Sequence, residues 1–540
     1  MSRFVFGALA VVAAAAPAVR AQAPAADWPS YNRTLTGERF ARLREIGRDN
    51  VARLRVLCTY DTKQETSFQT GLLEVDGMLV GTTEDDIFAL DPDSCRERWR
   101  THEDYKPANP LKVNRGAAYL DGRLFRGTQD GRVLAYDART GRRVWEATIA
   151  DPGKGETVPA APIAWEGLVF VGNAGGDNKG VKGRMYALDA ATGAIRWEAY
   201  MVPRGPNDSA RGPAAPQPPR VAASWDNGAG IPVTGGANWT SYTLDPGSGT
   251  LYVPGGNAAP DFVPGVRGGE NLFTGAVVAL DARTGAYRAD YKMVPGDDGH
   301  DWDVASPAVV ATTRGGRRLL ALTPKDGFLY GFDLANGRRL YRTPVTTVLN
   351  ATAPLVPGRE TRFCPGTQGG SEWNGPAYDP TRDLLYTGEV DWCVTVRPAS
   401  AEQVREVPTG KPWSGMDTKN PRRAYGDFDP PEQWAGRFAA TDAATGRVRW
   451  RFRAPAPIMS GVTPTAGGVV LFGDMGGTLY ALDSDRGAVL WSQKVGGAVG
   501  GGVITYATPA GQRVAAAVGM TSPIWPTEKV TAKVVVLGVR

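Results

Sequence analysis

Short runs of alternating apolar and polar residues recur along the chain, each ending in the same kind of turn. In the clearest copies the run ends at an Asp, a turn such as Asp-Ala-Arg-Thr-Gly follows, and a second run returns. Alternation with a period of two predicts β-strands, and the glycine suits a hairpin turn because it accepts a positive φ. The turns begin at Asp91, Asp137, Asp189, Asp281, Asp333, Asp442 and Asp483.

The returning run usually carries a tryptophan eight residues after the Asp. Adjacent copies lie 41 to 52 residues apart, and the two wider gaps hold weaker versions of the phrase, YTLDPGSGTLYV and PAYDPTRDLLYTG. A unit of this size buries its aromatic face only by stacking on the next unit. Counting the weaker copies gives about eight units, which predicts an all-β, eight-bladed β-propeller. An open solenoid is the alternative, but ring closure removes exposed strand edges.

Two stretches interrupt the rhythm. Residues 203–223 are rich in proline, and residues 401–434 are charged, with Pro and Gly throughout. Both are expected to be long inter-strand loops on a face of the propeller, where such loops often cover a site. Simple surface decoration is the alternative for each.

The first residues predict export. Arg3 precedes a short apolar run from Phe4 to Ala16, and Val19-Arg20-Ala21 supplies small residues at a usual cleavage spacing. Residues 1–21 are therefore expected to be a signal peptide and 22–540 a single propeller domain. The run is too short for a membrane anchor, and no later segment is apolar for long enough to span a bilayer. We expect a protein of the bacterial periplasm.

Four cysteines are present, and an even number in an exported chain suggests two disulfides. Three pairings are possible. Closeness along the chain favours Cys58–Cys95 and Cys364–Cys393, with free buried thiols as the alternative. No Cys-x-x-Cys-His run occurs, so no covalently attached haem is expected.

Charge and histidine content exclude several classes of function. The net charge is +5 without a long basic run, which argues against nucleic-acid binding. Only two histidines occur, so a His-rich zinc site or a Ser-His-Asp triad is not expected. Any chemistry must rest on carboxylates, amides, cationic side chains or a bound cofactor.

Polar residues outside the turns fall where strands of separate blades end. VGNAGGDNKGVKGR carries Asp177, VPGGNAAPDF carries Asn257, and GDDGHDWDVASP carries Asp301 and Asp303. Carboxylate and amide oxygens that converge from separate strands make a site for a hard cation. Each residue alone is more often a turn or cap residue, so the prediction depends on convergence.

Cationic and aromatic residues suggest an anionic planar ligand. NRGAAYLDGRLF carries Arg115, GGANWTSY carries Trp239, and TPKDGFLYGF carries Lys325. Arg and Lys bind anionic groups, and a Trp beside glycines can form a flat stacking floor. The alternative for Trp239 is an ordinary core tryptophan.

With these motifs the chain resembles the quinoprotein alcohol dehydrogenases, whose cofactor is pyrroloquinoline quinone (PQQ). The resemblance runs from WPSYNRTLTGERFARLREIGRDNVARL to GGVITYATPAGQRVAAAVGM, and GGANW, GGN-x-AP and HDWD are its more specific motifs. It implies eight blades of W-shaped four-stranded antiparallel sheets, with PQQ on the axis above a calcium or lanthanide ion. It also implies oxidation of an alcohol, with electrons passed to a separate acceptor such as a periplasmic cytochrome c.

The resemblance assigns roles to particular residues. It implies Asp177, Asn257, Asp301 and Asp303 as metal ligands, with Asp301 as the catalytic base and Asp303 as the extra acid of lanthanide-dependent members. Three carboxylates suit a trivalent ion better than calcium. An alignment shifted by one step would make Asp303 the base and Ala305 the neighbour typical of calcium members. The implied cofactor contacts are Gln69, Arg115, Ala174, Gly175, Gly176, Trp239, Lys325 and Glu372.

The chain departs from the family on the opposite side of the cofactor. Asn109-Pro110 stands where the family usually has a vicinal disulfide, Gln69 replaces a Glu, Glu372 an Asn, and Met459 a Trp. This altered ceiling leaves the substrate open, so a sugar or polyol dehydrogenase is an alternative. A second alternative is a cofactor-free propeller that serves as an outer-membrane assembly scaffold, against which the acidic residues argue.

Overall fold

Four-stranded antiparallel sheets make up most of the molecule. The computed structural model describes residues 28–105, 111–295, 298–419 and 423–539, so the expected signal peptide and Asn109-Pro110 lie outside the described residues. The first sheets are β3 (Leu73–Val75), β4 (Met78–Thr82), β5 (Asp86–Leu90) and β6 (Glu97–His102); β8 (Ala118–Leu120), β9 (Arg123–Gly127), β10 (Arg132–Asp137) and β11 (Arg143–Thr148); and β12 (Ile163–Trp165), β13 (Leu168–Gly172), β14 (Arg184–Asp189) and β15 (Ile195–Tyr200).

The same order continues along the chain. The next sheets are β17 (Thr243–Asp245), β18 (Thr250–Pro254), β20 (Ala276–Asp281) and β21 (Tyr287–Lys292); β22 (Val309–Thr312), β23 (Arg318–Leu322), β24 (Phe328–Asp333) and β25 (Arg339–Pro344); β27 (Ala377–Asp379), β28 (Leu384–Asp391), β31 (Ala435–Asp442) and β32 (Val448–Ala454); and β33 (Thr463–Pro464), β34 (Val469–Gly473), β35 (Thr478–Asp483) and β36 (Val489–Lys494).

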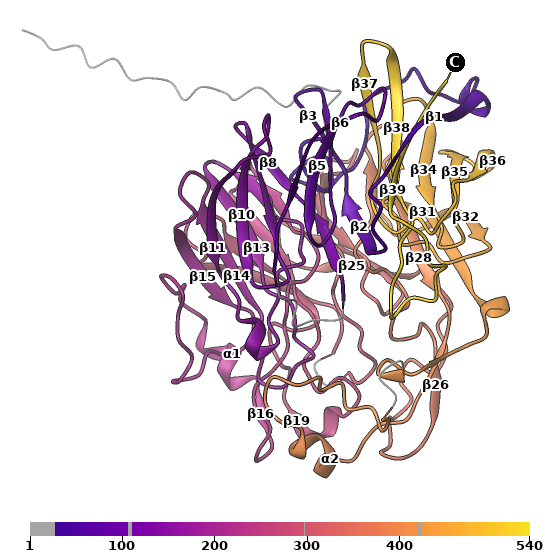
Figure 1. Cartoon of the computed structure of the whole chain (residues 1–540). Coiled ribbons are helices and arrows are strands. Elements are labelled where there is room, and N and C mark those ends of the chain that lie inside the picture. The colour runs from indigo at the N-terminus through magenta and orange to yellow at the C-terminus, as the bar shows by residue number, and fades with distance from the viewer. Residues whose placement is uncertain (1–27, 106–110, 296–297, 420–422, 540) are drawn as a thin grey trace, which may run out of the picture.

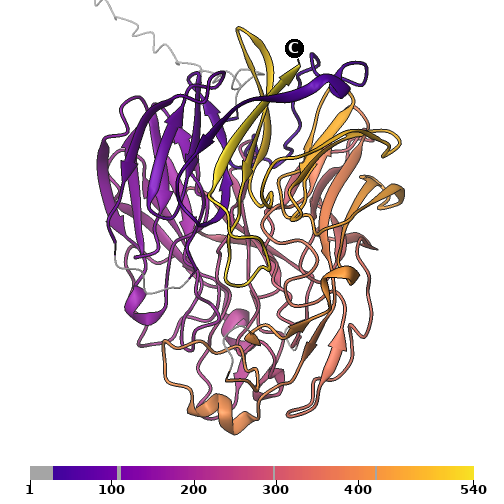
Figure 2. The ribbon, with the colours of Figure 1, turned by 45° about the vertical axis from the view of Figure 1, so that its right-hand side comes forward.

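The last four-stranded sheet joins the two ends of the described chain. Strands β37 (Val503–Thr508), β38 (Gly511–Val518) and β39 (Lys533–Val539) are completed by β1 (Leu54–Asp61), which pairs antiparallel with β39. In Figures 1 and 2 indigo β1 lies beside the yellow C-terminal strands. This pairing covers the outer edge of β39 with a strand from the start of the chain, and the fold is an all-β propeller.

Smaller elements fill the connections. They are the parallel pair β2 (Ser67–Gly71) and β7 (Val113–Gly116), the pair β16 (Asp226–Asn227) and β19 (Arg267–Gly268), the sheet of β26 (Thr361–Phe363), β29 (Val394–Val396) and β30 (Asp427–Phe428), and the short helices α1 (Pro219–Ala223), α2 (Ala401–Glu406), η1 (Val51–Arg53), η2 (Pro152–Lys154), η3 (Pro264–Val266) and η5 (Pro431–Gln433). Both helices α1 and α2 lie at the lower end in Figure 1. No helix in the described part of the chain is long and apolar enough to cross a membrane.

Four of the five repeated tryptophans, Trp99, Trp145, Trp197 and Trp450, pack on the turn of the next sheet. Trp99 donates its indole N–H to the carbonyl of Ala138 at 3.0 Å, and its ring lies against the site of a Cβ on Gly141. Gly141 has φ +70°, and the side chain of Asp137 accepts hydrogen bonds from Thr140 within the same turn. Trp145 and Trp197 repeat the contact one and two sheets further on. The turn glycine is therefore needed twice: it adopts a positive φ, and its lack of a side chain leaves room for the indole ring.

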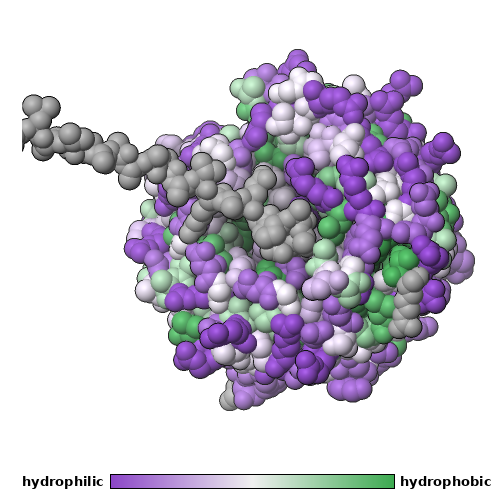
Figure 3. Space-filling view, turned by 90° about the horizontal axis from the view of Figure 1, so that it is seen from above, coloured by the Kyte–Doolittle hydropathy of each residue, from purple (hydrophilic) through white to green (hydrophobic). Residues whose placement is uncertain are grey.

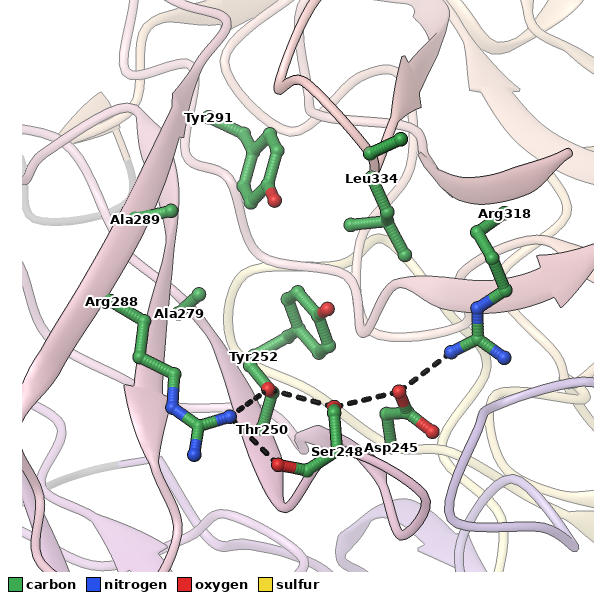
Figure 4. A pocket seen from close by; sticks show the side chains of 11 residues that line it. Asp245, Ser248, Thr250, Tyr252, Ala279, Arg288, Ala289, Tyr291, Arg318 and Leu334 are labelled. Atoms are coloured by element: carbon green, nitrogen blue, oxygen red, sulfur yellow. Dashed lines mark hydrogen bonds and ion pairs between the residues drawn. The ribbon is translucent and has the colours of Figure 1, made fainter.

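One copy has an alanine in place of the tryptophan, and a cavity opens there. The residue eight places after Asp281 is Ala289, and a cavity of about 330 Å³ opens beside it, lined also by Leu334 and Ala335 of the next turn. Figure 4 shows the polar wall of this cavity, where Asp245 joins Arg318 and Ser248. These polar groups already bond one another, so we interpret the cavity as an unfilled docking position.

Filling this position is expected to stabilise the protein. In Ala289→Trp the indole would pack on Leu334 and Ala335, as Trp99 does on its own neighbouring turn, and buried apolar area would increase. Cavity-filling changes of this kind typically add about 0.5–2 kcal/mol to the free energy of unfolding. Urea denaturation of Ala289→Trp and wild type would measure the change, with Ala289→Ser as a control that leaves the cavity open. A lower midpoint for the tryptophan variant would contradict this interpretation.

Both predicted disulfides are confirmed. Cys58 bonds Cys95, with Cα atoms 5.8 Å apart, and Cys364 bonds Cys393, with Cα atoms 4.4 Å apart. The first bond ties β1 to the turn between β5 and β6, and so fastens the closing sheet to its neighbour. On the face seen from above in Figure 3, hydrophilic and hydrophobic side chains are interspersed.

Candidate functional site

The predicted ligands lie on loops at the end of the sheets opposite the Asp-Thr-Gly turns. Strand β13 starts opposite Asp189 and ends at Gly172, so the following loop carries Asp177 away from the turn. Strand β18 starts opposite Asp281 in the same way and ends at Pro254, just before Asn257. Figure 1 shows long connections gathering at this lower end.

Three carboxylates from three separate loops converge. Asp177, Asp261 and Asp301 each offer one oxygen atom, and these atoms all lie within 4.8 Å of one another. Asp261 and Asp301 are buried, and Asp177 is half-buried. Oxygens at this separation can share a cation whose bonds to oxygen are about 2.3–2.6 Å long. Of the predicted acids, the structure brings Asp177 and Asp301 together, and it adds Asp261.

Aromatic and acidic side chains alternate along His300-Asp301-Trp302-Asp303. His300 stacks on Trp302 with ring centroids 4.4 Å apart, and both meet the ring of Phe363 edge-on. Trp302 is part of a hydrophobic cluster and donates to the carbonyl of Pro365. The two aspartates are therefore anchored by their aromatic neighbours. Asp301 has φ +57°, a left-handed conformation that Asp tolerates better than most residues.

Asp303 lies beside the three carboxylates, but its oxygens have other partners. One oxygen accepts the backbone N–H of Asn257 at 2.7 Å, and the other accepts the indole N–H of Trp239 at 3.2 Å. Lys325 lies 3.1 Å from Asp303 and 3.6 Å from Asp301. This approach requires glycine at position 256, because a Cβ there would stand 2.8 Å from the Asp303 carboxylate.

Asn257 contacts the cluster through its amide. Its Nδ2 donates to Asp261 at 2.8 Å, which leaves the amide oxygen as the group that can serve as a ligand. Asp261 stands four residues after Asn257 in the same loop, so the two residues enter the site together. Sequence reasoning missed Asp261, although it is the one carboxyl in the VPGGNAAPDF segment that was singled out for Asn257.

Trp239 forms a flat surface with a cation on each of two sides. The guanidinium of Arg115 lies 4.6 Å from the Trp239 ring centre and 5.3 Å from that of Trp373, and the ammonium of Lys325 lies 5.4 Å from Trp239. Arg115 also donates to the carbonyl of Trp239 at 2.9 Å. Burial lowers the pKa of Arg115 to about 10, so it remains a cation at neutral pH. Trp239 lies at the site and is not an isolated core residue.

Several buried polar atoms around Trp239 have no hydrogen-bond partner. They are Gln69 Oε1, Arg115 Nε, Glu372 Oε1, Asp261 Oδ2 and Asp301 Oδ2. Folded proteins rarely leave such groups unsatisfied, so each is a position where a bound group can supply the partner. All except Asp261 belong to the set predicted from the sequence. The donors and acceptors present therefore fit a polar, anionic cofactor above a cation.

The glycine-rich loop before Asp177 is held close to the backbone of a neighbouring connection. Ala174 donates its N–H to the carbonyl of Thr157 at 2.8 Å. Gly175 has φ +99°, and a Cβ there would stand 2.1 Å from the carbonyl oxygen of Gly155, so only glycine fits. Gly176 lies against Ala237, two residues before Trp239.

The acidic cluster carries more negative charge than the side chains around it neutralise. Burial raises the pKa of Asp301 and of Asp261 well above the usual range, and Lys325 only partly offsets this for Asp301. Burial and the charge of Asp303 raise the pKa of Asp177 to about 6. A cation between the three carboxylates would restore their ionised form.

The loop of residues 401–434 covers the cluster. Trp413 donates its backbone N–H to the carbonyl of Asp177 at 2.6 Å, and Phe262, next to Asp261, donates to the carbonyl of Ser414 at 2.8 Å. The hydroxyl of Tyr425 lies 3.4 Å from the Asp177 carboxylate. The expectation of a loop over the site is met here. Residues 203–223 instead run along the outer strand β15, where Glu198 pairs with Pro213 and Ala215.

The propeller, the stacking floor and the acidic cluster together define a class of cofactor-dependent dehydrogenase. Residues 28–355 match the family described as "Glucose/ethanol/alcohol dehydrogenase, beta-propeller domain". The chain belongs to this family, the PQQ-dependent alcohol dehydrogenases, which are oxidoreductases acting on alcohols. Residues 435–525 also match the family described as "Outer membrane protein assembly factor BamB", a segment that excludes the acidic cluster.

Named relatives extend over nearly the whole chain. A quinohemoprotein alcohol dehydrogenase of Comamonas testosteroni is 29% identical, over 91% of this chain and 72% of its own. A lanthanide-dependent methanol dehydrogenase of Methylacidiphilum fumariolicum is 28% identical, over 93% of this chain and 86% of its own. The solved structure of a europium-containing methanol dehydrogenase superposes with a TM-score of 0.82 at 26% identity, covering 96% of this chain and 98% of that one.

Glu372 makes the ligand-free protein sensitive to pH. Burial raises its pKa from 4.5 to about 7, so the folded state binds a proton that the unfolded state releases between these values. Stability should therefore fall as pH rises from about 4.5 to 7, by roughly 3 kcal/mol for a shift of this size. Urea denaturation at several pH values should show that Glu372→Gln makes this slope shallower, while the raised pKa of Asp177 leaves part of it in place. Parallel pH profiles for the two proteins would contradict the assignment.

Proposed function

We propose that this protein is a periplasmic dehydrogenase that oxidises an alcohol with PQQ and a metal ion. The observation that carries the proposal is the Asp177–Asp261–Asp301 cluster beside a Trp239 floor flanked by Arg115 and Lys325. An anionic planar cofactor over a cation uses each of these groups. The four-stranded sheets, closed by β1 on β39, support a ring of eight blades around this axis.

The proposed cofactor site follows from the charged and unpartnered groups around Trp239. Arg115 would bind a carboxylate of PQQ, because it is buried, cationic and short of one acceptor. The unpartnered side-chain oxygens of Gln69 and Glu372 would contact the same ligand. The backbone of Ala174, Gly175 and Gly176 would lie close to it. The ammonium of Lys325 would bind polar atoms at the edge of PQQ while the cofactor stacks on Trp239. When bound, PQQ accepts the hydride and the metal ion acts as a Lewis acid.

Asp301 is the proposed catalytic base. Its Oδ2 has no hydrogen-bond partner, its backbone is fixed in a left-handed conformation, and its aromatic neighbours His300 and Trp302 hold the segment in place. A carboxylate so placed can accept the hydroxyl proton of an alcohol. Burial raises the pKa of Asp301, Lys325 at 3.6 Å partly offsets this, and a bound cation would further favour the ionised form. Asp303 is bonded to Asn257, Trp239 and Lys325, which favours Asp301 over Asp303 as the base.

The compartment and the electron acceptor are also proposals. Two disulfides suit an oxidising compartment. A relative at 29% identity is named as the first subunit of a methanol dehydrogenase that uses cytochrome c. We therefore propose a separate cytochrome c as the acceptor of electrons.

Reconstitution tests the function directly. Purified protein is incubated with PQQ together with calcium or lanthanum, and dye reduction is followed with alcohols, polyols, sugars and aldehydes. We expect turnover with alcohols only when both PQQ and a metal ion are present. Protein without PQQ and PQQ without protein serve as controls. Failure to bind PQQ with either metal would refute the proposal.

The role of Asp301 has its own test. In Asp301→Asn the proton acceptor is lost, and turnover should fall by about 10²–10⁴-fold. Because Asp301 also lies in the acidic cluster, metal and PQQ contents are measured on the same samples, and only samples at full occupancy are compared. Wild-type turnover at full occupancy would exclude Asp301 as the base.

A further inference from the structure

Asp261 lies among the candidate metal ligands, although it is not one of the ligands expected from the sequence. The three oxygens that converge within 4.8 Å come from Asp177, Asp261 and Asp301, while Asp303 is outside the group. Asp261 is fully buried, with 0% of its side-chain surface exposed. One of its oxygens accepts from Asn257, and the other has no hydrogen-bond partner.

A buried carboxylate oxygen without a partner needs an explanation. Removing an ionised carboxylate from water is costly unless a cation or a donor replaces the water. Neighbouring Asp177 and Asp301 could donate to Asp261 only while protonated, and once the cluster is ionised none of the three carboxylates can donate to another. Lys325 pairs with Asp301 and Asp303, and the charge of Arg267 only partly offsets the effect of burial on Asp261. A metal ion between the three carboxylates would supply the missing partner for Asp261.

Asp303 is engaged by other groups. Its two oxygens accept from Asn257 N–H and Trp239 Nε1–H, and Lys325 lies 3.1 Å away. These contacts orient the Trp239 ring and the backbone that leads into Asn257. Asp303 thus has the partners expected of a positioning residue.

We propose that Asp261 binds the metal ion directly and makes the site prefer a trivalent ion over calcium, while Asp303 positions Trp239 and Asn257. The proposal rests on the proposed function for the use of the ion. Three carboxylates balance the charge of a lanthanide ion, whereas with Ca²⁺ one negative charge stays buried and unbalanced. Since such a charge is costly, the balance favours the trivalent ion.

Direct binding measures this preference without turnover. The full chain, stripped of metal and without PQQ, is titrated with Tb³⁺, with luminescence excited through nearby Trp and Tyr, and bound Tb³⁺ is displaced with La³⁺ or Ca²⁺. Wild type should bind one equivalent and prefer La³⁺ over Ca²⁺ by at least about 100-fold. Asp261→Asn should weaken Tb³⁺ binding by at least about 100-fold and Ca²⁺ binding by less. These values correspond to the loss of one charged ligand.

Two further variants separate ligation from general damage. Asp303→Asn should change Tb³⁺ affinity by less than about tenfold, because Asp303 is not placed as a ligand. Glu389→Gln is the matched control: Glu389 is another fully buried carboxyl, on β28, whose acidic neighbours are Asp326 and Asp391. It should leave Tb³⁺ binding unchanged.

Thermal denaturation distinguishes a ligand from a structural residue. Without metal, Asp261→Asn should melt at or above the wild-type temperature, because the neutral amide avoids the cost of ionising a further carboxyl in a buried acidic cluster. The rise in melting temperature on adding Tb³⁺ should shrink in this variant. A variant that melts lower without metal but binds Tb³⁺ normally would overturn the proposal.

The outcomes also separate this proposal from the proposed function. Unchanged Tb³⁺ affinity in Asp261→Asn, a larger loss in Asp303→Asn, or no Tb³⁺ binding by wild type would each overturn the assignment of Asp261, even if the enzyme oxidises alcohols. Wild type that binds Tb³⁺ through Asp261 yet never turns over with PQQ would refute the dehydrogenase and leave the assignment standing.

Discussion

Three carboxylates held within 4.8 Å of one another are the constraint on which the site depends. Like charges at this separation repel, and burial removes the water that would screen them. The ring can hold them because each carboxylate comes from a different sheet, so separating them requires whole sheets to move. The sheets are fastened to one another where Trp99, Trp145 and Trp197 each dock on the turn of the next sheet. The repeat therefore provides the rigidity that a repulsive cluster needs.

In the segment from His300 to Asp303, aromatic side chains that pack alternate with acidic side chains that face the site. In the run from His300 to Asp303, the two aromatic side chains stack and join a hydrophobic cluster, while the two acids face the polar site. Burial of Trp302 thereby stabilises the placement of two charges that would not be buried alone. Lys325 serves both acids, which leaves Asp177 and Asp261 without an equally close cation in the described part of the chain. This deficit is a structural reason for a metal ion at this end of the axis.

The sequence predicted the repetitive part of the molecule well, because that part depends on local rules. Strand alternation, the turn at Asp137 and the docking of Trp99 each follow from residues close together in the sequence or from neighbouring copies. Both disulfides were predicted from proximity along the chain. Asp261 was missed because its importance arises only when loops after β13 and β18 meet the segment before β22. The partners of Asp303 were hidden for the same reason, since Trp239 and Lys325 reach it from other sheets. Contacts between loops that are far apart in the sequence cannot be read from either loop alone. A family resemblance assigns roles only to residues that match the family's motifs.

One long connection is tied to two of the loops that carry the acidic cluster. The loop of residues 401–434 bonds through its backbone to the loop of Asp177 and to the residue after Asp261. It also brings the Tyr425 hydroxyl to 3.4 Å from the Asp177 carboxylate. A shift of this loop would therefore act on the segments that hold two of the three carboxylates. The geometry of the acidic cluster thus depends on this connection as well as on the sheets.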